Sequence, residues 1–179
     1  MMATIAGVNQ IEDIYPHYQE TPIGRLLEYH NLNRPFDRYV EAQLLVGMCM
    51  DNRKQLHIPD NFAYILRTGG GNLRSSEFKV SYAIGVGRVR AIALIAHNHC
   101  GMVHLMTKKD DFIQGLVDIG WDATMAADHF NSFASMFEIG NEVDFVLSEA
   151  GRLRARYPGV LVAPMLYRLE DNRLYLLGQ

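Results

Sequence analysis

The sequence contains few cysteines, no excess of basic residues and no long apolar run. Only two of its 179 residues are cysteines, so the chain is not a disulfide-rich scaffold of the kind common among small secreted proteins. It carries 17 Lys and Arg against 20 Asp and Glu, a formal net charge of −3, and so lacks the positive field that attracts nucleic acid. Apolar stretches such as residues 91–96 are far shorter than the ~20 residues of a membrane-spanning helix. We therefore expect neither a nucleic acid nor a membrane as a partner.

Length and composition predict one globular domain. With 49% hydrophobic and 21% charged residues, the chain falls in the ordinary range of proteins that fold around their own core. The expected domain spans residues 1–179, with an N-terminal arm and helix over 1–35 and an α/β core over 40–179. The first basic residue is Arg25, whereas secretory signals and transit peptides carry basic residues near their start. A cytoplasmic location is therefore expected, and in that reducing compartment a cysteine pair is typically buried, catalytic or metal-bound.

Hydrophobic patterning predicts an α/β fold. Short apolar runs over residues 43–49, 62–66 and 91–96 are typical of parallel strands covered on both faces. Apolar spacings of three and four, with capping and stop residues, predict helices over 22–31, 75–88, 108–119, 122–137 and 142–157. A further strand is expected over 159–164 and an edge hairpin over 166–177. Residues 1–22 lack periodicity and predict an irregular arm that packs on a partner subunit. The expected fold is thus a mostly parallel sheet flanked by helices, with a C-terminal edge hairpin and an N-terminal arm.

Cys49, His97 and Cys100 form a candidate metal site. Each follows or ends a predicted strand, and ligands of open parallel sheets bind outside the carboxyl ends of the strands. The gap of two residues between His97 and Cys100 lets both side chains face one ion. Two thiolates and one imidazole suit zinc and leave a fourth tetrahedral position for water, as in catalytic sites. One alternative is that both cysteines are small buried hydrophobic residues, and another is that His99 supports the site or replaces His97, which is preferred as the ligand.

Asp51 and Arg53 follow the first cysteine at intervals of two residues. If this loop is roughly extended, alternate side chains share a face. The carboxylate of Asp51 would then point toward the metal, and the guanidinium of Arg53 toward the carboxylate. The alternative interpretation is an ordinary ion pair on the protein surface.

Three consecutive glycines, Gly69, Gly70 and Gly71, follow the second predicted strand at the same edge of the sheet. Glycine permits positive φ and close backbone approach, so this loop could present amide groups to a small anion. These glycines are therefore candidate substrate-binding residues. The loop lacks the Gly-Lys-Ser/Thr ending of a nucleotide-binding P-loop, and the alternative is a flexible turn.

Taken in order along the chain, three motifs resemble those of the β-class carbonic anhydrases. They are Cys49-x-Asp51-x-Arg53, the loop Arg67-Thr-Gly-Gly-Gly and His97-x-x-Cys100-Gly101-Met102. The sequence looks most similar to the short prokaryotic clade, in which the motifs read Cys-Met-Asp-x-Arg, Arg-Asn-Ala-Gly-Gly and His-x-x-Cys-Gly-Met. The resemblance covers residues 44–102 and is looser beyond them. Within the motifs, Asn52 replaces the usual Ser or Ala, and Thr68-Gly69 replaces Asn-Ala.

This resemblance implies one zinc ion per subunit on Cys49, His97 and Cys100, a catalytic dyad of Asp51 and Arg53, and a homodimer or dimer of dimers. The implied activity is the reversible hydration of carbon dioxide to bicarbonate by a zinc-bound hydroxide. Two thiolates cancel the zinc charge, so activity is expected to rise between pH 7 and 9 and not at a lower pH. The alternatives are hydrolysis of carbonyl sulfide or carbon disulfide, and a non-catalytic zinc-binding homologue.

Overall fold

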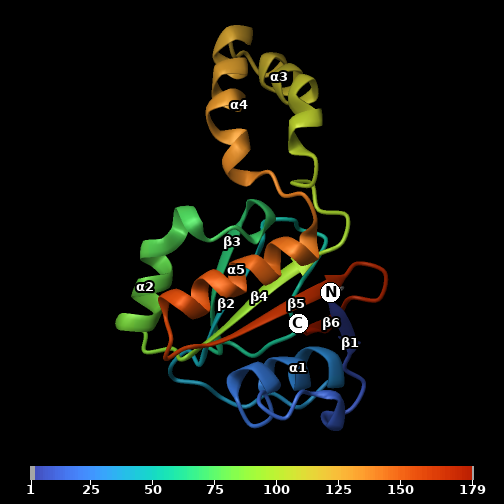
Figure 1. Ribbon diagram of the computed structural model, residues 1–179, viewed down its shortest axis with the longest axis vertical. Coiled ribbons are helices and arrows are strands. Elements are labelled where there is room, and N and C mark those ends of the chain that lie inside the picture. Colours follow the sequence, from blue (N-terminus) through green and yellow to red (C-terminus); the bar gives the residue numbers. More distant parts are fainter. Residues whose placement is uncertain (1–2, 179) are drawn as a thin grey trace.

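The computed structural model describes residues 3–178, which form a six-stranded sheet with helices on both faces (Figure 1). The strand order is β1-β6-β5-β4-β2-β3. Strands β3, β2, β4 and β5 are parallel to one another, whereas β6 is antiparallel to both β5 and β1. The expected α/β fold with a mostly parallel sheet is therefore confirmed. The strands are β1 (Thr4–Gly7), β2 (Leu44–Cys49), β3 (Ala63–Thr68), β4 (Ala91–His97), β5 (Leu161–Arg168) and β6 (Arg173–Gly178).

Helix α1 (Pro22–Leu32) covers one face of the sheet, and α2 (Glu77–Gly85) and α5 (Glu142–Arg156) cover the other (Figure 1). Alternate side chains of β4 enter two separate cores: Ala91, Ala93 and Ile95 lie beneath α1, and Ile92, Leu94 and Ala96 lie beneath α2 and α5. A strand with helices on both faces needs apolar residues at every position. This requirement explains the uninterrupted apolar run that predicted the strand.

Strand β3 lies at the edge of the sheet and is only partly covered. Tyr64 and Ile65 are 40% and 44% exposed, so the prediction that the run 62–66 is covered on both faces is wrong. Helix α5 packs on β4 and β5, and α1 packs on β4 and β6. The central strands therefore receive the helical cover, and an apolar run alone does not distinguish them from an edge strand.

The N-terminal residues do not form the expected irregular arm. Residues 4–7 form β1, which pairs with β6 and so lies outside the C-terminal hairpin that was expected at the sheet edge. The side chains of Val8, Ile14 and Tyr18 are at most 3% exposed and join the core beneath α1. The segment therefore contributes to the core of its own chain. The expected dimer consequently rests on the family resemblance and not on this segment.

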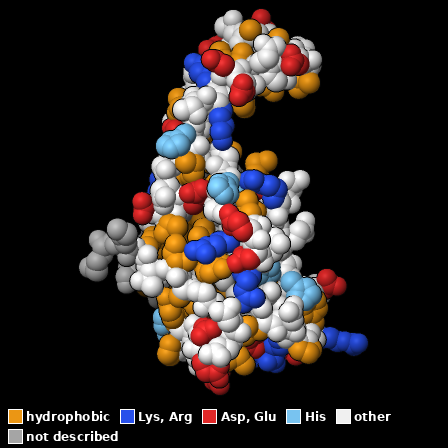
Figure 2. Space-filling view, turned by 90° about the vertical axis from the view of Figure 1, so that its right-hand side faces the viewer, with side chains coloured by type: hydrophobic (Ala, Val, Ile, Leu, Met, Phe, Trp, Pro, Cys, Tyr) orange, Lys and Arg blue, Asp and Glu red, His pale blue; other side chains and the backbone are white. Residues whose placement is uncertain are grey.

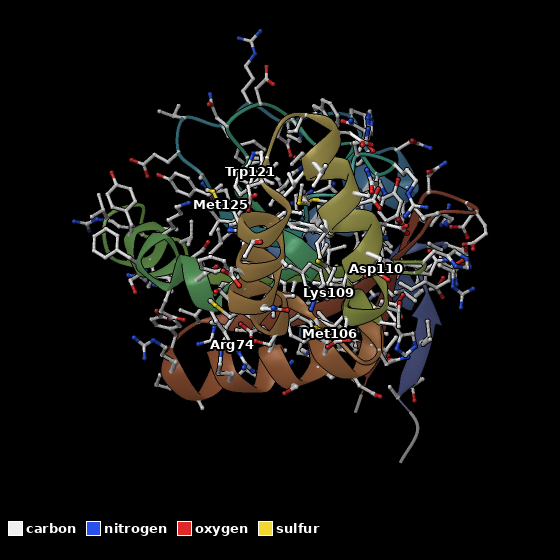
Figure 3. All side chains as sticks on the ribbon, turned by 90° about the horizontal axis from the view of Figure 1, so that it is seen from above. Arg74, Met106, Lys109, Asp110, Trp121 and Met125 are labelled. Atoms are coloured by element: carbon white, nitrogen blue, oxygen red, sulfur yellow. The ribbon has the colours of Figure 1, made fainter. Side chains whose placement is uncertain are left out.

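Helices α3 (Lys109–Asp118) and α4 (Ala123–Phe137) form a hairpin that projects from the sheet (Figure 1). The end of this hairpin stands clear of the core in the space-filling view (Figure 2). Asp122 caps α4 by accepting hydrogen bonds from two backbone N–H groups of its first turn. Trp121 and Met125 lie together at the hairpin end (Figure 3) and are 40% and 62% exposed. Within residues 3–178, no helix combines the length and apolar character needed to cross a membrane.

His30, near the end of α1, is expected to make folding stability depend on pH. Its Nε2 lies 2.9 Å from the carbonyl oxygen of Asn172, and its Nδ1 accepts a hydrogen bond from the backbone N–H of His57 at 3.0 Å. Both contacts are satisfied by the neutral ring with its proton on Nε2. Burial lowers the pKa of His30 from 6.5 to about 4, and the nearby charges of His57 and Arg173 act in the same direction.

Because the folded state favours neutral His30, this stabilisation is complete above pH 6.5 and is lost as the pH falls toward 4. At 1.36 kcal/mol per pKa unit, the loss in the free energy of unfolding amounts to as much as about 3 kcal/mol. Urea unfolding of the metal-free protein and of His30→Gln, each at pH 7 and pH 4.5, isolates this contribution. An equal pH dependence in both proteins would contradict it.

Candidate metal centre

Adjacent parallel strands bring the three predicted metal ligands together. Cys49 is the last residue of β2, His97 is the last residue of β4, and Cys100 lies in the turn that follows β4. Met48 pairs with Ile95, so the carboxyl ends of the two strands coincide. One ligand atom from each of the three residues lies within 4.8 Å of the other two, and all three residues are buried.

This arrangement fits a zinc ion. The Sγ atoms of Cys49 and Cys100 are 3.9 Å apart, too far for a disulfide but close to the ~3.8 Å edge of a tetrahedron with zinc–sulfur bonds of about 2.3 Å. Nε2 of His97 is buried and has no hydrogen-bond partner within residues 3–178. Nδ1 of the same ring lies 2.9 Å from the carbonyl oxygen of Asn98. A bond donated there puts the proton on Nδ1 and leaves the Nε2 lone pair free for a metal.

The two thiols influence each other strongly. A hydrogen bond from Cys100 lowers the pKa of Cys49, and His97 contributes to the same effect. The thiolate formed on Cys49, together with burial, raises the pKa of Cys100. In addition, the backbone N–H of Cys100 donates to Oε1 of Glu142 at 3.2 Å, which ties the turn to the start of α5. A divalent cation favours both thiolates, so metal binding would replace the proton shared by the two sulfurs.

Asp51 and Arg53 form a closely matched ion pair beside these ligands. Nε and Nη2 of Arg53 donate to the carboxylate of Asp51 at 3.0 and 2.6 Å, and the backbone N–H of Arg53 donates to Oδ1 at 2.9 Å. These bonds hold the pKa of Asp51 well below its usual range. Oδ2 of Asp51 lies 3.9 Å from Nε2 of His97. The carboxylate is therefore ionised, fixed by Arg53 and adjacent to the predicted metal position.

The neighbouring His99 does not join the cluster. Its backbone has a φ of 55°, which breaks the strand pleat, and its exposed side chain lies 3.4 Å from Oε1 of Glu170. The carbonyl oxygen of His99 instead accepts a hydrogen bond from Nη2 of Arg53 at 2.9 Å. Arg53 thus connects the loop after β2 to the turn after β4. His97 faces the two thiols because it is the last residue of β4, whereas His99 lies in the turn beyond the strand.

The three glycines form a tight turn, the 3-10 helix η2 (Gly69–Gly71), immediately after β3. Gly70 and Gly71 have φ values of 64° and 74°, which residues other than glycine rarely adopt. A Cβ atom on Gly71 would lie 3.5–3.6 Å from the backbone of Met48 and Cys49. The turn therefore packs closely behind the first cysteine. Binding of an anion or substrate by this turn stays a prediction.

An apolar cavity of about 300 Å³ lies between the helical hairpin and the candidate metal centre. It reaches the centre through Met50, Gly69 and Met102, which adjoin the ligand loops in sequence or in space. The remaining lining comes from the hairpin and the short turn before it: Leu105, Phe112, His129, Phe130, Phe133, Ala134 and Phe137. Such a cavity admits an uncharged molecule more readily than an ion.

Two basic residues close to the centre were missed by sequence reasoning. Lys54 is fully buried, and its Nζ donates to the carbonyl oxygens of Cys49 and Asp51. Nη1 of Arg67 donates to the same two oxygens from β3, at 3.4 and 3.3 Å. Lysine is almost never fully buried, and the segment around Lys54 has no periodicity that would signal burial. The Arg67-Thr-Gly-Gly-Gly motif pointed to this loop, although not to these hydrogen bonds.

Comparison with known proteins gives structural matches only. No protein-family model matches the sequence, and no curated protein matches it either. Among solved structures, a β-carbonic anhydrase from Trichomonas vaginalis has a TM-score of 0.63 at 16% identity, over 93% of this chain and 96% of that one. A carbonic anhydrase from Glaciozyma antarctica has a TM-score of 0.62 at 19% identity, over 76% of this chain and 83% of its own. A carbon disulfide hydrolase has a TM-score of 0.50 at 20% identity, over 89% and 90% of the two chains.

The agreement with the structure from Trichomonas vaginalis extends over nearly the whole length of both chains. At these identities the likeness shows the architecture, and it agrees with the fold that the motifs implied. The chain has the fold of the β-class carbonic anhydrases.

Proposed function

We propose that this protein is a zinc enzyme that catalyses the reversible hydration of carbon dioxide to bicarbonate. The observation that carries the proposal is the buried, unpartnered Nε2 of His97 beside the thiols of Cys49 and Cys100. The Asp51–Arg53 pair adjoins this cluster. A structural zinc site would use a fourth strong protein ligand. Here the next group is a carboxylate held by a guanidinium, which suits a catalytic centre.

Each residue of the centre has a distinct role in this proposal. Zinc held by the two thiolates and His97 would supply an activated water as the nucleophile. Ionised Asp51 can only accept hydrogen bonds, so it orients a donor group toward the substrate. Arg53 occupies both carboxylate oxygens and so keeps Asp51 away from the metal. The apolar cavity receives the uncharged substrate, and Gly69 of the glycine turn forms part of its wall together with Met50 and Met102.

The cavity also favours a second candidate activity, hydrolysis of carbonyl sulfide or carbon disulfide. These molecules are linear and uncharged like carbon dioxide but larger, and a cavity of about 300 Å³ has room for them. One of the structural neighbours is described as a carbon disulfide hydrolase. The same zinc centre and the same orienting carboxylate would serve both reactions.

Parallel assays on the zinc-loaded protein distinguish these activities. Hydration of carbon dioxide is followed by stopped flow with a pH indicator, and hydrolysis of the sulfur compounds by release of sulfide. We expect carbon dioxide hydration with a rate that rises from pH 7 to pH 9, because thiolate ligands reduce the acidifying power of zinc. A fully loaded protein that acts only on the sulfur compounds would favour the second activity. One that acts on none of the three would be a non-catalytic zinc-binding homologue.

A further inference from the structure

Lys54 occupies an unusual position directly behind the loop that carries Cys49 and Asp51. Its side chain is fully buried, and its Nζ lies 2.9 Å from the carbonyl oxygen of Cys49 and 3.2 Å from that of Asp51. One ammonium group therefore bridges the backbone of a predicted metal ligand and the backbone of the predicted orienting carboxylate. These two oxygens are two residues apart in the chain, so the bridge fixes the curvature of the intervening loop.

The partners of this ammonium group are not those of an ordinary buried lysine. Burying a charge is costly unless it is paired and hydrogen-bonded, yet within residues 3–178 Lys54 forms no ion pair with a carboxylate. The anionic groups that act on Lys54 through space are those of Cys49, Asp51 and Cys100. The cation is thus compensated by the candidate metal centre itself.

Arg67 completes the arrangement from the opposite side. Its Nη1 donates to the same carbonyl oxygens of Cys49 and Asp51, and its Nη2 donates to the carbonyl oxygen of Lys54 at 3.3 Å. Arg67 is exposed, whereas Lys54 is not. The loop after β2 is therefore held between an inner ammonium and an outer guanidinium. If Arg67 is removed, solvent can hydrogen-bond to the carbonyl oxygens in its place. Lys54 is fully buried, so solvent cannot substitute for its ammonium group.

We propose that Lys54 is a positioning residue of the metal centre: its ammonium group fixes the carbonyl oxygens of Cys49 and Asp51, and so presents the Cys49 sulfur at the position that zinc requires. This inference rests on the zinc site of the proposed function and assigns a residue outside the ligand set to it. Mutation of residues that orient metal ligands through hydrogen bonds typically weakens metal binding by about 10- to 100-fold. Lys54 acts here through the backbone of its partner ligand.

The test compares Lys54→Met with the unaltered protein and with Lys108→Met. Methionine has a similar length but neither charge nor donor groups. Lys108 is a matched control because its Nζ also donates to a backbone carbonyl beside the centre, that of Gly101, but the side chain is exposed. Zinc affinity is measured by competition with a chromophoric chelator. The absorption spectrum of the cobalt-substituted proteins reports the geometry of the thiolate ligands.

We expect Lys54→Met to bind zinc about 10- to 100-fold more weakly and to alter the cobalt spectrum, with no change in Lys108→Met. Wild-type zinc affinity and an unaltered cobalt spectrum in folded Lys54→Met would overturn the inference, even if its free energy of unfolding were reduced. If Lys54→Met does not fold, Lys54→Gln replaces it, with the same expected weakening and the same contradicting result. These readouts do not use turnover. A wild-type protein that binds zinc tightly but hydrates no carbon dioxide would refute the proposed activity and leave the role of Lys54 standing.

Discussion

Replacing Arg53 with alanine is expected to leave zinc bound and to abolish most of the catalytic activity. Arg53 donates three side-chain hydrogen bonds to Asp51, and Oδ2 of Asp51 is only 3.9 Å from the ligand nitrogen of His97. A carboxylate oxygen is itself a good zinc ligand. Without the guanidinium, Asp51 is free to turn toward the metal and to occupy the position needed by the reacting water. X-ray absorption of the zinc-loaded variant should then show a closed coordination shell that contains a carboxylate oxygen.

The variant Asp51→Ala separates the two roles of the dyad. It removes the orienting carboxylate and also the group that could close the centre, so zinc should stay bound with an open position. The rate should fall by about 10²-fold or more if the orienting hydrogen bond acts mainly in the transition state. Arg34→Ala is a suitable control, since the ion pairs of Arg34 with Glu28 and Asp37 involve neither a predicted ligand nor the dyad. Wild-type rates in both dyad variants, with zinc bound, would mean that the pair has no catalytic role.

Replacing Cys100 with serine is expected to remove most of the bound zinc. The unaltered protein, purified without added metal, should contain about one zinc ion per chain. A serine hydroxyl fits the same buried space but is not ionised near neutral pH and is a poor zinc ligand. Elemental analysis after exhaustive dialysis measures the loss. His99→Ala should keep its zinc, because that side chain lies outside the cluster and faces Glu170.

A Cys100→Ser protein that retains a full zinc content would exclude Cys100 as a ligand. Circular dichroism must show that the variant is folded, since Cys100 is buried and its N–H is bonded to Glu142. Loss of zinc in a folded variant assigns the ligand. Equal loss of zinc from His99→Ala would show that the ion is held by a different set of residues.

The sequence was sufficient to predict most elements of the fold because their local signals agree with their surroundings. Capping residues predicted a helix that starts at residue 22, and Thr21 does cap α1 by accepting hydrogen bonds from two backbone N–H groups. The apolar run over residues 91–96 predicted β4 because both faces of that strand are buried. The predicted strand over 159–164 and the first run of the hairpin are one continuous strand, β5, which passes through Pro164. Proline weakens a local strand signal, but neighbouring β4 holds this segment in place.

Features that depend on distant partners could not be predicted in the same way. Strand β1 has four residues, and its pairing with β6 joins segments from opposite ends of the chain. The shared site of Cys49, His97 and Cys100, by contrast, was predictable, because the ends of parallel strands meet at one edge of a sheet. No comparable rule of sheet topology predicts the burial of Lys54. It follows from a loop that turns back beneath the strand end, and only the three-dimensional arrangement reveals it.

The hairpin of α3 and α4 begins and ends beside the candidate metal centre. Val103 and Ile139 form a parallel bridge, the N–H of Ile139 donates to the carbonyl oxygen of Met102, and Cys100 is tied to Glu142. The two ends of the hairpin are thus fastened together next to a predicted ligand. A change in the length of the segment between two fastened ends need not displace the residues beside those ends. Because the hairpin supplies much of the cavity wall, substitutions in α3 and α4 can change the size and shape of the cavity while Cys49, His97 and Cys100 keep their positions.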